Sequence, residues 1–79
     1  MAEKRYFAVI MPRSSLEAIL IAGYERGGKV IHSGRRCGFA LDYYPDEAVS
    51  YRREFGRAII GDFATRGEAV AAIMRKIRG

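Results

Sequence analysis

The sequence predicts a single α+β domain over residues 1–79. Three observations predict it. Apolar runs rich in aromatic and β-branched residues alternate with segments whose apolar residues recur at helical spacing, the capping-box spacing occurs twice, and glycine and proline separate the segments. A chain of 79 residues buries only roughly 60–65% of the surface that its unfolded form exposes. The core is therefore small, and we expect a monomer or a homodimer.

The first strand is expected at residues 6–11, an apolar run that stops at Pro12 and is typical of a central strand buried on both faces. Ser14 and Glu17 have the capping-box spacing, so a helix is expected to begin at Ser14. Two glycines end it at residues 27 and 28. Its apolar face consists of Leu16, Ile19, Leu20, Gly23 and Tyr24.

Residues 29–33 and 38–44 are expected to form a β-hairpin. If Gly34 is the first residue of a two-residue turn, Ser33 lies opposite Arg36 and His32 lies opposite Cys37. Val30 then lies opposite Phe39. One face is apolar, and the other is more polar and is expected to face solvent or a partner. The apolar face holds Val30, His32, Cys37, Phe39, Leu41 and Tyr43, and the polar face holds Lys29, Ile31, Ser33, Arg36, Gly38, Ala40, Asp42 and Tyr44.

A second helix is expected to begin at Pro45 and Asp46 and to end at Gly56, which can adopt a left-handed conformation. Its apolar stripe consists of Ala48, Tyr51 and Phe55. A strand is expected within residues 57–63, and a last helix begins at the second capping box, Thr65 to Glu68. That helix packs through Val70, Ile73, Met74 and Ile77.

The resulting order, β-α-β-β-α-β and then α, is the ferredoxin-like split-βαβ arrangement with an additional C-terminal helix. The additional helix covers an edge of the sheet, covers part of its open face, or binds a partner. The sequence does not choose among these alternatives, and a fold that is so widely reused says little about function.

The net charge is +5, with eleven arginines and three lysines. This balance attracts nucleic acid, anionic lipid or an acidic protein surface. A GC-rich coding sequence would also give many arginines without any functional demand. Cys37 is the sole cysteine, so no intramolecular disulfide forms and a cytoplasmic protein is expected. No apolar run is long enough for a signal peptide or a membrane span, and we expect no membrane partner.

Two arginine pairs are the candidate binding residues. Arg52 and Arg53 have no acidic residue three or four positions away, so local ion pairs do not neutralise them. Three alternatives remain for these two arginines. They form a solvated basic face, an ion pair with a distant acidic residue (Asp42, Glu25 or Glu47), or a binding site for phosphate or carboxylate. We group Arg57 with them.

Arg35 and Arg36 are expected at the hairpin tip, where side chains project from the fold. An isolated basic turn is often only a solubilising device. Arg36 shares the predicted polar face with Tyr44, which makes both candidates for a contact surface. Guanidinium groups beside aromatic rings suit the binding of phosphate, carboxylate or stacked bases.

Catalytic and metal chemistry are not expected. A thiolate nucleophile needs a base and an orienting group, and a structural zinc site needs four ligands, whereas the chain has one cysteine and one histidine, Cys37 and His32. The acidic residues form no convincing general acid/base pair, and the glycines form no phosphate-binding loop. We therefore predict a protein that is not an enzyme and uses no metal and no cofactor.

Residues 38–44, Gly-Phe-Ala-Leu-Asp-Tyr-Tyr, partly resemble the third-strand motif of RNA-recognition-motif domains. Gly38, Phe39, Ala40 and Tyr44 fit that motif, whereas Leu41 stands where a second stacking aromatic is expected. The predicted hairpin register also turns Phe39 inward. This resemblance implies direct, weakly specific binding of RNA or DNA.

The chain also resembles, in type and without shared motif residues, the small inhibitors of phages and mobile elements, especially anti-CRISPR proteins. The resemblance rests on a short stand-alone α/β domain with no enzymatic signature and a surface of one charge sign. It implies a stoichiometric inhibitor that occupies a protein subunit or a guide-RNA or DNA contact of a ribonucleoprotein complex. Many members of that class are acidic mimics of DNA, and the charge of +5 departs from that pattern. A basic inhibitor would meet an acidic protein face or touch nucleic acid directly.

Overall fold

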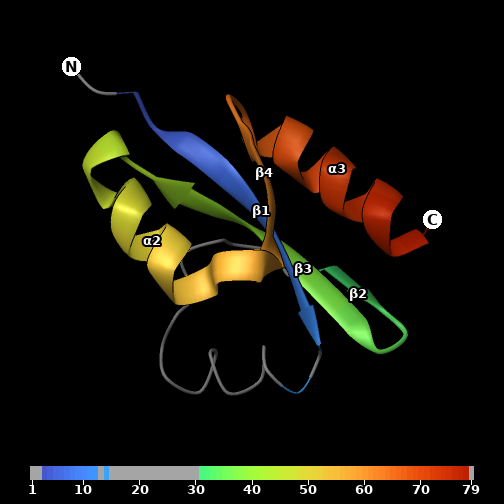
Figure 1. The fold of residues 1–79 in the computed structure, drawn as a ribbon. Helices are drawn as coiled ribbons and strands as arrows, with labels where there is room; N and C mark the ends of the chain where they lie inside the picture. Colours follow the sequence, from blue (N-terminus) through green and yellow to red (C-terminus); the bar gives the residue numbers. More distant parts are fainter. Residues whose placement is uncertain (1–2, 13, 15–30, 79) are drawn as a thin grey trace.

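An antiparallel sheet lies between two helices in the computed structural model, which describes residues 3–12, 14 and 31–78 (Figure 1). The strand order within the described part is β2-β3-β1-β4. The strands are β1 (Arg5–Pro12), β2 (Ile31–Ser33), β3 (Arg36–Tyr43) and β4 (Ile59–Phe63). The helices are α2 (Ala48–Phe55) and α3 (Arg66–Arg78), with short 3-10 turns η1 (Pro45–Glu47) and η2 (Gly56–Ala58) on either side of α2.

The first strand is central, as predicted, because β1 pairs antiparallel with β3 on one side and with β4 on the other. The hairpin register is also confirmed, with Ser33 opposite Arg36 and His32 opposite Cys37. Gly34 has a φ of 61°, a left-handed conformation that glycine adopts without steric cost. The predicted partner of Phe39, Val30, lies outside the described residues, as does almost all of the helix predicted after Ser14.

Helix α2 covers the apolar face of the sheet. Its buried residues Tyr51 and Phe55 pack onto a core that includes Phe39 and Leu41, and Phe39 meets Phe55 edge-on at 6.0 Å between ring centroids. The predicted stripe of this helix is therefore confirmed. Gly56 ends the helix, as predicted, with a φ of 49°, but its ψ of -117° lies outside the left-handed helical region that the prediction named.

Helix α3 covers the other face of the sheet, on the side opposite α2 (Figure 1). The prediction that this polar-looking face meets solvent or a partner is wrong for its middle. Gly38 and Ala40 are buried there, and Ile73 of α3 is fully buried against them. The physical reason is that small residues on this face of the sheet let α3 pack closely against it. A Cβ on Gly38 would lie 2.6 Å from Cγ2 of Ile73. The helix begins as predicted, with the amide of Glu68 donating to the hydroxyl of Thr65 at 3.2 Å.

Candidate functional site

The hairpin tip presents Arg35 and Arg36 at one end of the sheet. The turn at Gly34 places both arginines at the start of β3, and both are exposed. Arg36 lies opposite Pro12, the last residue of β1, in the strand register. The tip therefore adjoins the end of the central strand.

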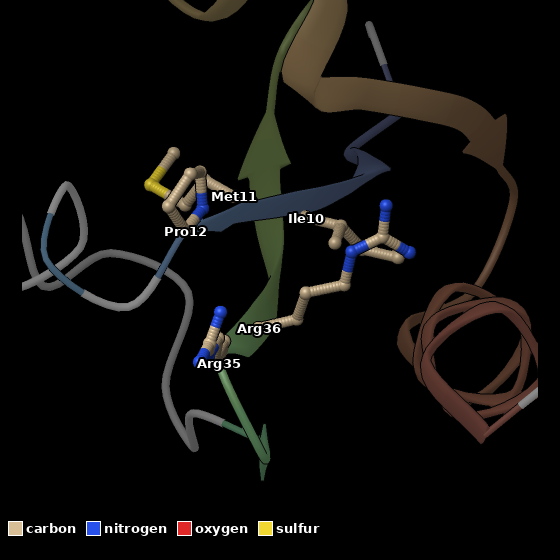
Figure 2. Close-up of a pocket in the computed structure, with 5 residues that line it drawn as sticks. All are labelled: Ile10, Met11, Pro12, Arg35 and Arg36. Atoms are coloured by element: carbon tan, nitrogen blue, oxygen red, sulfur yellow. The ribbon is translucent and has the colours of Figure 1, made fainter.

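A pocket lies at this junction and is lined by Ile10, Met11, Pro12, Arg35 and Arg36. Figure 2 shows the two arginine side chains leaving the strand in different directions, Arg36 beside Ile10 and Arg35 on the side of Pro12. Arg35 belongs to the turn and Arg36 is the first residue of β3, so the two side chains leave the hairpin from different local conformations. The two guanidinium groups therefore flank an apolar floor and are placed to bind two neighbouring anionic groups rather than one.

Arg35 also borders a second hollow, with Pro12, Ser14 and Gly34. Within the described ranges, the ion pairs are Lys4 with Asp42 and Arg5 with Asp62. Neither hairpin arginine thus has an acidic partner there, and guanidinium groups of this kind suit phosphate or carboxylate.

Arg52 and Arg53, the second arginine pair, have different surroundings. The guanidinium of Arg52 lies over the ring of Phe7 at 4.9 Å, and the same ring stacks on Tyr43 at 3.9 Å between centroids. Arg52 thus covers the ring of a core residue on one side and is exposed to solvent on the other. Arg53 and Arg57 are exposed on α2 and η2, and neither has an acidic partner among the residues that the structure describes.

Tyr44 does not join the hairpin arginines. It is 43% exposed, but it follows the last residue of β3, whereas Arg36 is the first. Eight residues of extended chain separate the two by roughly 26 Å. Arg36 and Tyr44 thus lie at opposite ends of β3, and α3 covers Ala40 between them. The tyrosine ring lies instead near Lys4, whose ammonium nitrogen is 5.6 Å from the ring centroid.

Asp42 and Asp62 have partners that the sequence did not indicate. Lys4 pairs with Asp42 at 3.2 Å, and this hydrogen bond raises the pKa of Lys4. Asp62 accepts from Nε of Arg5 at 3.2 Å and from the hydroxyl of Tyr43 at 2.5 Å. Burial, and then the bond to Asp62, raise the pKa of Tyr43 above its ordinary value.

This network joins β1, β3 and β4, and its acid and base lie 57 residues apart in sequence, so no local spacing indicates it. Asp42 is therefore not the tertiary partner of Arg52 or Arg53. The alternative partner Glu25 lies outside the described residues, and Glu47 accepts from the backbone amide of Tyr44 at 3.0 Å.

Cys37 is fully buried, and its thiol donates to the backbone carbonyl of Met11 at 3.6 Å. Full burial is typical of a structural thiol rather than of a nucleophile. The described residues hold no cluster of three or more histidine, cysteine or acidic side chains that could bind a metal ion. Among the described helices, none combines the length and apolar character needed to cross a membrane.

Comparisons with protein-family models, curated proteins and solved structures gave no match for this chain. The function is therefore argued from the residues alone. The predicted binding residues fall into three places: the hairpin tip with Arg35 and Arg36, the α2 side with Arg52, Arg53 and Arg57, and the far end of β3 with Tyr44. Ile10, Met11 and Pro12 complete the hairpin pocket. The sequence did not indicate that these three residues line a pocket, because the pocket forms only where β1 pairs with β3.

Proposed function

We propose that this chain is a non-enzymatic binding protein that inhibits or regulates a nucleic-acid machine, with the hairpin tip as its main contact. The observation that carries the proposal is the pocket in which Arg35 and Arg36 flank the apolar end of β1 without an acidic partner in the described part of the chain. Apolar residues between two guanidinium groups suit a partner that combines anionic groups with a flat or apolar surface. A nucleic-acid strand within a ribonucleoprotein complex has that combination.

Inhibition of a guide-RNA effector complex, the action of anti-CRISPR proteins, is the concrete version of this proposal. The partner is then a protein or ribonucleoprotein complex of the cytoplasm, and the chain acts by occupying a protein, guide-RNA or DNA contact. The exposed arginines at the tip support a contact of this kind, because bidentate guanidinium–phosphate bonds provide both affinity and orientation.

The proposed architecture is the ferredoxin-like split-βαβ arrangement with α3 as the additional C-terminal helix. The antiparallel order β2-β3-β1-β4 supports it, since this arrangement places the first strand between the third and the fourth. It requires a helix between β1 and β2, within residues 14–27. Backbone chemical shifts of that segment test this requirement, and extended values there would contradict it.

Direct, weakly specific binding of RNA or DNA is the second candidate. The exposed arginines Arg53 and Arg57, which add to the positive charge of the tip, favour it. Base stacking of the RNA-recognition-motif type receives less support. Phe39 is buried under α2, and Ala40 is buried under α3, so neither presents a face for a base.

A direct experiment measures target-DNA binding by a panel of purified guide-RNA effector complexes with and without the protein. We expect at least one complex to lose target binding at a stoichiometric ratio. Arg35→Ala/Arg36→Ala should weaken this inhibition about tenfold or more, because exposed guanidinium contacts with phosphate are worth about 1–2 kcal/mol together. The matched control, Arg66→Ala/Arg78→Ala, removes the same charge from the two ends of α3.

Equal inhibition by the folded tip variant and the wild type would refute the tip as the contact, and no inhibition across the panel would refute the concrete version. Equal weakening by both double variants would show that net charge alone acts. A gel-shift titration of free single-stranded and duplex nucleic acid at two salt concentrations addresses the second candidate. Affinity that falls steeply with salt would support direct binding, and no complex with either form would discard it.

A further inference from the structure

Strand β4 forms one margin of the described sheet, and it carries an irregularity. Ala8 pairs with Gly61 and Val9 pairs with Ile59, so Ile60 is an extra residue in the ladder, a β-bulge. The bulge turns Ile60 outward, and its side chain is 39% exposed. In the described part of the chain, β4 pairs with β1 alone, so its other edge presents unpaired backbone groups.

A hollow lies beside this edge and is lined by Ile60, Ala72, Arg75 and Lys76. Ala72, Arg75 and Lys76 belong to α3, which covers this face of the sheet and also contacts β4. Arg75 and Lys76 are exposed, and neither is paired with an acid among the described residues. The hollow therefore combines the outer edge of β4, unpaired within the described residues, with the apolar side chain of Ile60 and a basic rim.

We propose that the β4 edge and the adjoining turn of α3 bind an extended acidic peptide segment of a protein partner, which adds to the sheet as a further strand. This inference goes beyond the proposed function, which concerns the hairpin tip. Backbone hydrogen bonds to an exposed edge provide affinity in strand addition, and alternate side chains provide specificity. Here one apolar side chain would pack on Ile60, and acidic side chains would reach Arg75 and Lys76.

Charge favours an acidic segment over a second copy of this chain. A twofold pairing of two β4 edges would bring two copies of Arg75 and Lys76 together, and each chain carries a net charge of +5. The acidic residue of β4 itself does not oppose an acidic ligand, because Asp62 is neutralised by Arg5 and accepts from Tyr43. The site is thus selective for negative charge.

The probe is a blocked seven-residue peptide of alternating glutamate and valine. The control peptide has proline in place of each valine, which keeps the charge but removes the amide donors that a ladder needs. We expect the first peptide, and not the second, to slow amide hydrogen exchange within Ile59–Phe63 of the wild-type protein. This readout requires no variant.

Variants then test the basic rim. Arg75→Glu/Lys76→Glu should bind the valine peptide about tenfold more weakly, because two exposed ion pairs are replaced by repulsion. Arg53→Glu/Arg57→Glu makes the same change of charge on α2 and η2 and is the matched control.

Equal affinity of the two peptides, equal weakening by the two variants, or protection that appears outside β4 would each overturn the proposal. A wild-type dimer with β4 protected in the absence of peptide would overturn it in favour of a second copy.

Discussion

Replacing Gly38 with alanine tests how closely α3 is seated on the sheet. The added Cβ would lie 2.6 Å from Cγ2 of Ile73 and 2.8 Å from the backbone oxygen of Val9. Both neighbours are in the core, and overpacking of this kind costs about 1–3 kcal/mol. Replacing glycine also lowers the entropy of the unfolded chain, which offsets about 0.4–1 kcal/mol. The net loss is therefore about 0.5–2 kcal/mol, which lowers Tm by roughly 4–8 °C for each kcal/mol in a domain of this size.

Gly67 provides the matched control, because a Cβ there would meet nothing within 4 Å. Gly67→Ala in the first turn of α3 should raise the stability by about 0.5–1 kcal/mol. Thermal unfolding followed by circular dichroism compares both variants with the wild type. In an Ile73→Ala background, Gly38→Ala should cost less, since the closest atom is removed. If Gly38→Ala is as stable as the wild type, the close contact between α3 and β3 is refuted.

Two further predictions concern the core around Phe7. Tyr43→Phe should lose less stability at alkaline pH than the wild type. The pKa of Tyr43 is raised above 10.0 in the folded protein. The stability that the protonated hydroxyl contributes is therefore present below pH 10.0 and is lost as the pH rises through the folded-state pKa. The fall in Tm between pH 8 and pH 11 should be smaller in the variant, and equal falls would contradict the assignment. Arg52→Ala should cost about 0.5–1 kcal/mol in urea unfolding through the lost contact with the Phe7 ring, whereas Arg53→Ala should stay within about 0.5 kcal/mol of the wild type. Equal losses in the two variants would contradict the separate roles of these arginines.

Local rules predicted the hairpin and the second helix. A glycine at the first position of a two-residue turn fixes the pairing of the flanking strands, so the register at Arg36 and Cys37 followed from Gly34. The apolar stripe of α2 and its end at Gly56 followed in the same way. Each of these features depends on residues that are close in sequence.

The position of α3 could not be predicted, because an amphipathic stripe shows that a helix buries one face but not which surface it meets. The face of the sheet that holds Gly38 and Ala40 was expected to meet solvent or a partner, since small residues add little to the hydrophobicity of a strand face. In the fold these same residues let Ile73 approach the sheet. The bond between Arg5 and Asp62 likewise depends on the pairing of β1 with β4. The hairpin prediction therefore placed Arg36 at the start of β3, where the structure has it, whereas Tyr44 lies beyond the other end of that strand.

The coverage of the sheet limits where a partner can bind. Helix α2 packs on one face and α3 on the other, so the broad β-surface that single-stranded nucleic acid uses in RNA-recognition-motif domains is occupied here by the chain itself. Contacts through described residues must then use ends, edges and outer helix surfaces. The hairpin tip is an end and the β4 margin is an edge, and each carries exposed cations beside apolar residues. Two separate cationic contacts suit a partner that is engaged at two points, where linked binding strengthens two individually weak interactions.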